Sequence, residues 1–391
     1  MKTEHSKIAG LIYFFTLLSA FSYGFIYITP IYVLSIGGNA IDVSWFLTAA
    51  GIATMCLVGQ TGKMSFKLGA ANVCAIGILL ICIGDGCLIQ EHHVGVLFLL
   101  AGVLFGVGWS FFYAASPMLL NLFSTDKNRG KRISYLSSFI VFGTALAPVF
   151  TEHFANIHRL NHLFYIIPLC IGFAMATLFF IIGRFMINQN SALKPKILKK
   201  SRKSFLSVMN SEAKYPIIMV FLGACVFSTM MNYQTLYAIG HHVDFSIYYL
   251  VYMLTVIASR FIFGGILTAK NPIKPTPYLL VLMLAALIGM ILIPIGNQYL
   301  YALIAIAMGI SYGLVYPLIK TYAVNESEPH LRDYAIAYFT QSYFIGMYFF
   351  PLIAGSLIHL FGFKGLLLTL AVIVVIDGFI GLSRSFKRSK K

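Results

Sequence analysis

Long apolar stretches make up most of the sequence, and they restrict the chain to a small set of folds. Each is roughly 18–25 residues long, the length at which an α-helix crosses the hydrocarbon core of a bilayer. The stretches are continuous rather than alternating in polarity, so a transmembrane β-barrel is not expected. The sequence therefore predicts an all-α membrane protein with twelve transmembrane helices, at residues 8–36, 43–61, 71–90, 95–122, 133–151, 162–185, 215–240, 245–268, 276–295, 299–322, 334–357 and 365–383.

Composition places the chain in a lipid bilayer rather than in water. It is 59% hydrophobic and only 10% charged, whereas a soluble domain carries about 25% charged residues. The net charge of +16 would suit a nucleic-acid-binding protein. Such a partner needs a soluble basic face, however, and the positions of the charges exclude one.

The Lys and Arg residues predict the orientation of the helices. With the N-terminus in the cytoplasm, 24 of the 28 cationic residues fall on the cytoplasmic side, and only Arg159 and Lys364 fall outside. The other two, Arg260 and Lys320, lie within predicted helices. This positive-inside asymmetry places both termini in the cytoplasm. Together with the short loops and the unpaired apolar cysteines, it predicts a multi-pass protein of a bacterial inner membrane.

The second half of the chain resembles the first. A shift of 202 positions aligns Asp42 with Asp244 and Gly62 with Gly264. Such duplication predicts two pseudo-symmetric six-helix bundles, at residues 1–186 and 215–391. Residues 187–214 hold the densest cationic run and are expected to form a cytoplasmic linker, either solvated or as a short helix on the membrane surface. A shift of 203 positions aligns further identical residues without a gap: Gly106 with Gly309, Tyr113 with Tyr316, Arg129 with Arg332, Gly143 with Gly346 and Pro148 with Pro351.

The sequence contains no arrangement typical of an enzyme. It lacks His-Glu-x-x-His and the phosphate loop G-x-x-x-x-G-K, so a self-contained ATP-driven pump is not expected. The six cysteines lie in apolar stretches without metal-site spacing and are interpreted as packing residues. The pairs His92–His93 and His241–His242 fall in predicted outer loops, where a pH-sensing or metal-binding role is the minor interpretation. We expect no catalytic residue, no metal and no cofactor.

Four segments are similar to the motifs of one transporter family, and the resemblance extends over nearly the whole chain. Pro30–Gly38, followed by Asp42–Phe46, resembles the first outer loop of the major facilitator superfamily. The loop 2–3 motif of that family, Gly-x-x-x-Asp-Arg/Lys-x-Gly, matches at Gly62, Lys67 and Gly69, with Phe66 in place of the Asp. The remaining matches are Gly106–Tyr113, continuing to Arg129–Gly130, in the fourth helix and loop 4–5, and Gly143–Pro148, in the Gly-Pro motif of the exporters' fifth helix.

This resemblance implies a secondary transporter that works by alternating access. It implies a small-molecule substrate, a proton as the coupling ion and a monomer in the lipid bilayer. Helices 3, 6, 9 and 12 would stand outside, and the other eight would line a cavity. Ion pairs between loops would form an inner gate, because Arg129 and Arg332 are aligned by the repeat and lie beside acids. The predicted gating residues are Gly62, Lys67, Gly69, Arg129, Arg332 and Asp333.

Depth along the cavity helices selects candidate substrate-binding residues. Aromatic faces with a few amides suit an amphipathic organic substrate. For any single Tyr, packing with a satisfied hydroxyl is an equal alternative. The candidates are Tyr23 and Tyr27 on helix 1, Trp109 and Tyr113 on helix 4, Asn232 and Gln234 on helix 7, Tyr312 and Tyr316 on helix 10, and Gln341 on helix 11.

Charged residues within helices are more informative, because placing a charged side chain in lipid costs free energy. Arg260 on helix 8 is expected to bind the substrate or hold the coupling charge, the alternative being that it snorkels or pairs with a backbone carbonyl. Lys320 is expected to snorkel. For Asp85 and Asp377, on helices expected outside the cavity, structural pairing and proton coupling both stay open.

A cationic cavity residue without cavity acids favours an anionic or zwitterionic substrate, such as a carboxylate metabolite or a siderophore. The sequence is therefore interpreted as a proton-linked exporter of a small organic solute. An importer of similar solutes and, less favoured, a membrane-embedded enzyme or sensor are the alternatives.

Overall fold

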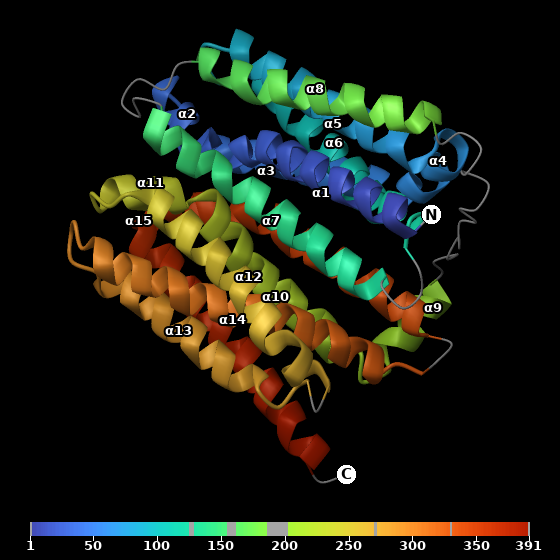
Figure 1. Ribbon diagram of the computed structural model, residues 1–391. Helices are drawn as coiled ribbons and strands as arrows, with labels where there is room; N and C mark the ends of the chain where they lie inside the picture. Colours follow the sequence, from blue (N-terminus) through green and yellow to red (C-terminus); the bar gives the residue numbers. More distant parts are fainter. Residues whose placement is uncertain are drawn as a thin grey trace. The chain divides into compact units, whose positions relative to one another are not determined.

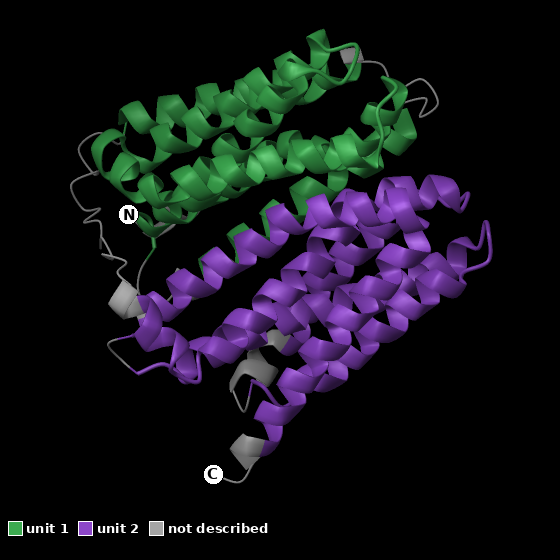
Figure 2. Cartoon of the chain, turned by 180° about the vertical axis from the view of Figure 1, so that it is seen from behind, with its two compact units in different colours: residues 1–197 green, residues 198–391 purple. Residues whose placement is uncertain are grey.

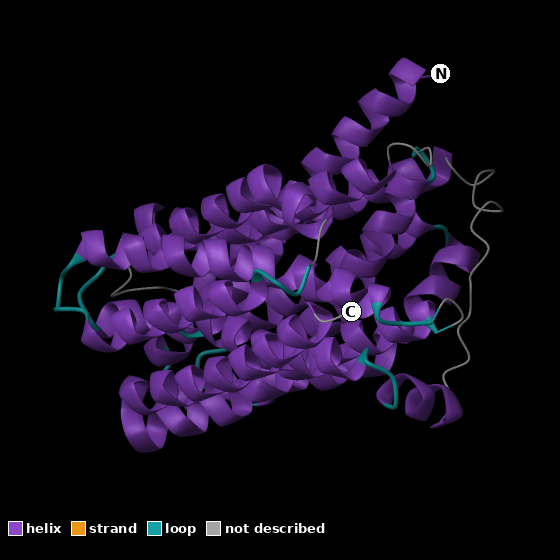
Figure 3. Ribbon diagram, turned by 90° about the horizontal axis from the view of Figure 1, so that it is seen from below, coloured by secondary structure: helices purple, strands orange, loops and turns teal. Residues whose placement is uncertain are grey.

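The computed structural model is built of helices. Within the described residues every regular element is a helix, and strands are absent from them (Figure 3). The chain divides into two compact units, Met1–Ile197 and Leu198–Lys391 (Figure 2). The residues that the structure describes are 2–124, 129–154, 162–185, 202–269, 272–328 and 331–389.

The N-terminal unit contains eight α-helices and short 3₁₀ segments (Figure 1). Helix α9, which follows in the chain, lies within the predicted linker 187–214, of which residues 187–201 lie outside the described part. The elements of the first unit are α1 (Lys2–Gly24), η1 (Phe25–Ile28), α2 (Thr29–Ser35), α3 (Ala40–Leu57), η2 (Val58–Gln60), α4 (Thr61–Leu68), α5 (Ala70–Gln90), α6 (Val96–Asn121), α7 (Arg129–Phe154), η4 (His162–Tyr165) and α8 (Ile166–Phe185).

The C-terminal unit ends in a helix of 58 residues, α15, that is interrupted at Gly362, where φ is 65°. Only glycine adopts this conformation without strain, so the chain can turn there between two helical segments. The elements of this unit are α9 (Arg202–Met209), α10 (Lys214–Asn232), α11 (Gln234–Gly240), α12 (Phe245–Ala269), α13 (Thr276–Leu292), α14 (Gln298–Asn325) and α15 (Arg332–Ser389).

Ten helices of the described chain are long and apolar enough to cross a membrane. The last of them, Tyr334–Phe386, has 53 residues and contains the break at Gly362. Thr276–Leu292 is apolar but, at 17 residues, shorter than the others.

Two of the predicted helices, at 8–36 and 215–240, contain local interruptions. The first changes to a 3₁₀ turn at η1 before α2 begins. Pro30 in the first turn of α2 has no N–H to donate and its ring excludes the carbonyl four residues earlier. The second breaks at Tyr233 (φ −113°, ψ 1°). There the Asn232 side chain donates to the Ser228 carbonyl at 2.8 Å, a local bond by which Asn competes with helical backbone bonds.

The glycines aligned by the repeat lie where helices cross closely. A Cβ atom at Gly106 of α6 would overlap the Ala50 carbonyl oxygen of α3. At its repeat partner Gly309 of α14, a Cβ would lie 2.7 Å from the Tyr252 carbonyl oxygen of α12. Small residues let helix backbones approach in lipid, where apolar burial gives little drive for association.

The second aligned pair, Gly143 and Gly346, behaves in the same way. A Cβ at Gly143 of α7 would overlap the Leu17 carbonyl oxygen of α1, and one at Gly346 of α15 would lie 2.5 Å from the Phe221 carbonyl oxygen of α10. Equivalent helices are therefore neighbours within each unit. The neighbouring pairs are α1–α7, α3–α6, α5–α6 and α5–α8 in the first unit, and α10–α15, α12–α14, α13–α14 and α13–α15 in the second.

We predict that Gly106→Val and Gly309→Val each destabilise the protein by about 1–3 kcal/mol or more, because the added atoms overpack a backbone contact. Melting temperatures of the purified variants in detergent measure this. Gly10→Val is the control, since a Cβ there meets no atom within 4 Å. Equal melting of all three variants would show that these crossings do not need glycine.

Candidate functional site

In the N-terminal unit, two of the predicted substrate-binding residues form one aromatic stack. The rings of Tyr23 on α1 and Trp109 on α6 lie 3.8 Å apart between centroids and within 8° of parallel. Both side chains are buried in the protein. Tyr113, one turn along α6 with its ring centroid 5.7 Å from that of Trp109, is 39% exposed. The structure therefore brings three of the four candidates of this unit together.

Tyr27, the fourth candidate, lies in the 3₁₀ segment η1 and is buried. It occupies the interruption between α1 and α2. Helix interruptions at mid-membrane depth are a common feature of transporter binding sites, because they free backbone polar groups.

In the C-terminal unit, Tyr312 of α14 is the centre of a second aromatic cluster. Its ring stacks on Phe227 of α10 at 4.6 Å and 11°, and its hydroxyl shares a hydrogen bond with Tyr343 of α15. The ring of Tyr316 packs against Tyr343 at 5.3 Å. Gln341, two residues before Tyr343, is half-buried on the same helix.

The two predicted amides flank the break of the seventh predicted helix and are buried. The Asn232 amide donates to the Ser228 carbonyl at 2.8 Å and to its hydroxyl at 3.3 Å. The Gln234 amide donates to the Tyr301 hydroxyl at 2.7 Å. The side-chain oxygen Oε1 of Gln234 has no hydrogen-bond partner among the described residues. Gln234 therefore keeps an unused acceptor in its side chain.

Arg260 of α12 is half-buried and donates from Nε to the Gly313 carbonyl oxygen of α14 at 3.0 Å. The backbone carbonyl partner that the sequence left open is thus present, and this bond uses one of the five N–H donors of the guanidinium. Lys320 and Tyr312, both on α14, lie within electrostatic reach of Arg260. No carboxylate of the described residues is within ion-pair distance of it.

The predicted gating residues are only partly described. Gly69 has φ 90° between α4 and α5, a conformation that favours glycine. Gly62 lies within α4, and Lys67 in its last turn is exposed. Arg332 is exposed at the start of α15, whereas the side chains of Arg129 and Asp333 lie outside the described residues. The inner gate stays a prediction.

The histidine pairs and the cysteines do not form a metal site. Within the described residues no group of three or more His, Cys, Asp or Glu side chains could hold a metal ion. His93 lies 4.0 Å from the Glu91 carboxylate, and the His241 ring stacks on Tyr237 at 4.1 Å. All six cysteines are free.

Sequence reasoning missed Phe227 and Tyr343. Phe227 was not among the candidates, because depth alone does not distinguish a ring on the packed face from a ring facing Tyr312. Tyr343 could have been found from its spacing, since it lies two residues after the candidate Gln341 on the same predicted helix.

Comparison with known proteins identifies a single family. The family described as the Major Facilitator Superfamily matches residues 9–346. Among characterised relatives, the Quinolone resistance protein NorA of Staphylococcus aureus (strain MSSA476) is 23% identical over 346 residues, which cover 84% of each chain. NorA of strain MRSA252 is 22% identical with the same coverage.

Solved transporter structures share the fold. The nucleoside transporter NupG (D323A mutant) superposes with a TM-score of 0.76 at 14% identity, covering 96% of this chain and 99% of that one. A bacterial homolog of the human lysosomal transporter Spinster, inward-facing and unoccupied, has a TM-score of 0.77 at 11% identity and covers 98% of both chains. The human organic anion transporter MFSD10 has a TM-score of 0.68 at 11% identity, covering 96% of this chain and 99% of that one.

We predict that Tyr23→Leu shifts the fluorescence of Trp109, because it removes the stacked ring. The stack itself should contribute about 0.5–1.5 kcal/mol beyond burial. The chain has two tryptophans, so the measurement uses a Trp45→Phe background, in which Trp109 is the single emitter. Phe14→Leu on the exposed side of α1 should leave emission and melting temperature unchanged; an equal shift in that control would contradict the stacked geometry.

Proposed function

The chain belongs to the Major Facilitator Superfamily and is a multi-pass membrane transporter, and from this premise we propose that it exports a small zwitterionic or anionic organic solute in exchange for protons. Alternating access is the proposed mechanism. The observation that carries the proposal is Arg260, a guanidinium within electrostatic reach of Tyr312 that has a backbone partner but, among the described residues, no carboxylate within ion-pair distance. Export, coupling and substrate class are each argued below.

We propose that the chain crosses the membrane twelve times, as two six-helix bundles with both termini in the cytoplasm of a bacterial cell. The ten apolar helices support this once α15 is counted as two crossings, separated at Gly362, and α13 as one more. At a rise of about 1.5 Å per residue, the 17 residues of α13 are at the short end of what spans a bilayer.

The substrate class follows from the charges and rings of the C-terminal unit. A carboxylate on the substrate would accept the donors of Arg260 that Gly313 leaves unused, as a bidentate pair. Lys320 adds positive charge in the same region. The neighbouring stack of Phe227 and Tyr312 offers an aromatic face, which favours a planar amphipathic molecule.

Export is supported by the relatives. NorA is named for quinolone resistance, and a transporter confers resistance when it moves a drug out of the cell. Quinolones are planar and carry a carboxylate, so a zwitterionic fluoroquinolone is a suitable first probe for this chain. The aromatic stack of Tyr23 and Trp109 in the N-terminal unit is the second proposed contact surface for such a ring.

The orientation leads to a topology prediction. Reporter fusions after Asn190 and at the C-terminus should both read cytoplasmic, because the cationic residues are concentrated on one side of the predicted helices. A fusion after His93 should read external and serves as the internal control. A periplasmic or external reading at either of the first two sites would contradict the twelve-crossing arrangement.

Substitution of Arg260 tests the proposed substrate class. In proteoliposomes with an imposed pH gradient, Arg260→Lys should weaken fluoroquinolone transport, because an ammonium keeps the charge but loses the planar fork. Arg260→Met should reduce transport by roughly tenfold or more, the effect of losing an interaction of about 1.4 kcal/mol. Both variants should insert normally and melt close to the wild type.

Transport that is unchanged in Arg260→Met would show that Arg260 serves only to bind the Gly313 carbonyl. Tyr278→Met is a matched control, since Tyr278 lies on α13 with 76% of its surface exposed. The direction of the gradient that drives accumulation separates the exporter from an importer.

A further inference from the structure

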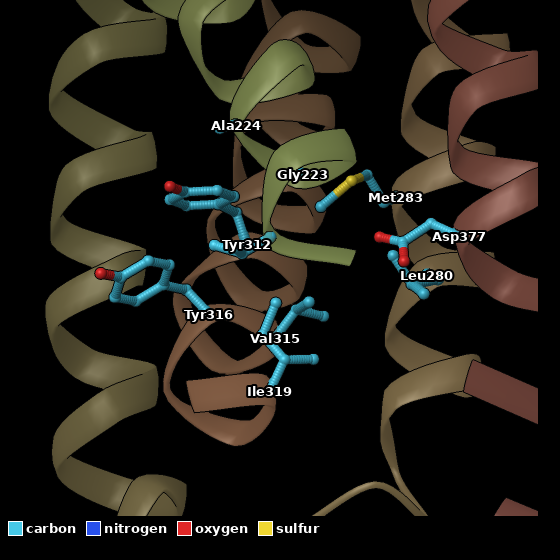
Figure 4. A pocket seen from close by; sticks show the side chains of 10 residues that line it. Gly223, Ala224, Leu280, Met283, Tyr312, Val315, Tyr316, Ile319 and Asp377 are labelled. Carbon is cyan, nitrogen blue, oxygen red and sulfur yellow. The ribbon is translucent and has the colours of Figure 1, made fainter. Parts of the chain in front are cut away.

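A small pocket lies in the C-terminal unit, among α10, α13, α14 and α15 (Figure 4). Its volume of about 10 Å³ is close to the minimum, about 10–15 Å³, that holds one water molecule. Apolar side chains make up most of its wall, including Val220, Leu280, Met283 and Ile319. A single acid, Asp377, lines the pocket with them.

Asp377 is buried without the partners that a carboxylate needs. Its side chain is 1% exposed, and its Oδ1 atom has no hydrogen-bond partner among the described residues. In Figure 4 the carboxyl group points from α15 toward Leu280 and Met283 of α13. An unpaired carboxylate in such surroundings costs several kcal/mol, so Asp377 carries a proton in this arrangement.

The elements around the pocket offer Asp377 no opposite charge. From α10 the pocket is lined by Val220, Gly223 and Ala224, and from α13 by Leu280 and Met283, none of which titrates. The α14 groups that titrate are Tyr312 and Tyr316, whose rings point away from Asp377 (Figure 4).

Among the described residues, no cation lies within ion-pair distance of Asp377. Lys320 of α14 lies near Arg260, a like charge that repels it. On α15 itself, Arg384 donates to the Glu212 carboxylate at 2.7 Å.

We propose that Asp377 is the residue that takes up and releases the coupling proton. When water enters the pocket as the surrounding helices separate, the O–H bond of the carboxyl breaks, the proton passes to that water, and a carboxylate remains. Rebinding of a proton reverses the step when the pocket closes. This inference rests on the proposed function, since it assigns the carrier of the proton that drives export.

The position of Tyr312 connects this acid to the substrate region. Tyr312 lines the pocket of Asp377 and also lies within electrostatic reach of Arg260. An ionised Asp377 adds negative charge to the unit that holds Arg260, and in a low-dielectric interior that charge attracts a basic group on the substrate. Protonation removes the attraction. Binding of a proton to Asp377 and binding of the substrate's basic group therefore weaken each other, as the exchange of one for the other requires.

Two variants test separately the carboxyl group of Asp377 and the pocket that would admit water. Asp377→Asn keeps the shape of the protonated acid but cannot release a proton. Gly223→Leu keeps the acid and adds an apolar side chain at a residue that lines the pocket, where a Cβ meets no atom within 4 Å. Asp377→Glu retains the titrating group. Gly10→Leu, a substitution into open space on α1, controls for the added side chain.

The assay is fluoroquinolone transport in proteoliposomes, with a pH gradient or with saturating substrate on both sides and no gradient. In Asp377→Asn and Gly223→Leu, gradient-driven accumulation should fall at least about tenfold, within the usual range of coupling between two ligands, while substrate exchange continues. Asp377→Glu and Gly10→Leu should keep gradient-driven accumulation. In detergent, substrate binding should release a proton from the wild type and none from Asp377→Asn.

The inference is overturned if Asp377→Asn accumulates substrate with the pH dependence of the wild type. It is also overturned if this variant loses exchange while still folded, or if Asp85→Asn, the same change at another buried aspartate, abolishes coupling when Asp377→Asn does not. Wild-type transport that ignores the pH gradient would refute proton coupling itself. In that case the infrared C=O band of a protonated carboxyl, lost in Asp377→Asn and titrating in the wild type, still decides whether Asp377 exchanges a proton.

Discussion

Direct contact between helix backbones is the constraint on which both units depend. In a bilayer the lipid tails are as apolar as the side chains they would displace, so helices associate through close packing and hydrogen bonds. The crossing of α3 and α6 uses both, because Gly106 lets the backbones touch and Thr54 donates from Oγ1 to the Gly106 carbonyl at 2.9 Å. In the other unit Gly309 has the equivalent place between α12 and α14. The glycine pairs Gly106/Gly309 and Gly143/Gly346, which repeat in the sequence, therefore lie where the crossings require them.

Much of the fold could be predicted, because the bilayer makes length and apolar character decisive. The sequence showed the apolar stretches that form the helices, and it showed the repeat that pairs Gly143 with Gly346. The interruptions were not all foreseen. Pro30 is a visible signal in the first helix. The break at Tyr233 is accompanied by the side-chain bond of Asn232 to Ser228, and a sequence does not reveal whether an Asn side chain bonds to its own helix or to a neighbouring one.

The candidate site was only partly within reach of the sequence. Depth along a helix placed Tyr23 and Trp109 at one level, and the structure stacks them. The rotation of each helix about its axis decides which rings face each other, and in helices that are apolar on every side no polar face records that rotation. For this reason Phe227 was missed, although it stacks on the predicted Tyr312. For Arg260 the sequence left a backbone partner open, and the bond to Gly313 supplies one.

The chemistry of recognition is unequal between the two units. The aromatic stack of the N-terminal unit has no charged side chain among its ring partners Phe105, Phe112 and Tyr113. The C-terminal unit holds Arg260, Lys320 and the buried acid Asp377, and α14 carries Lys320 and contributes residues next to the other two. A ring is recognised by shape and a charge by its opposite, so the proposed selectivity for rings and the proposed selectivity for charge lie in different segments of the chain. Because α14 presents Tyr312 and Tyr316 on one side and Val315 and Ile319 toward the Asp377 pocket (Figure 4), a shift of this one helix changes the surroundings of the cation and of the acid together. Coupling by such a helix needs no ion pair between Arg260 and Asp377, only that both energies depend on where α14 lies.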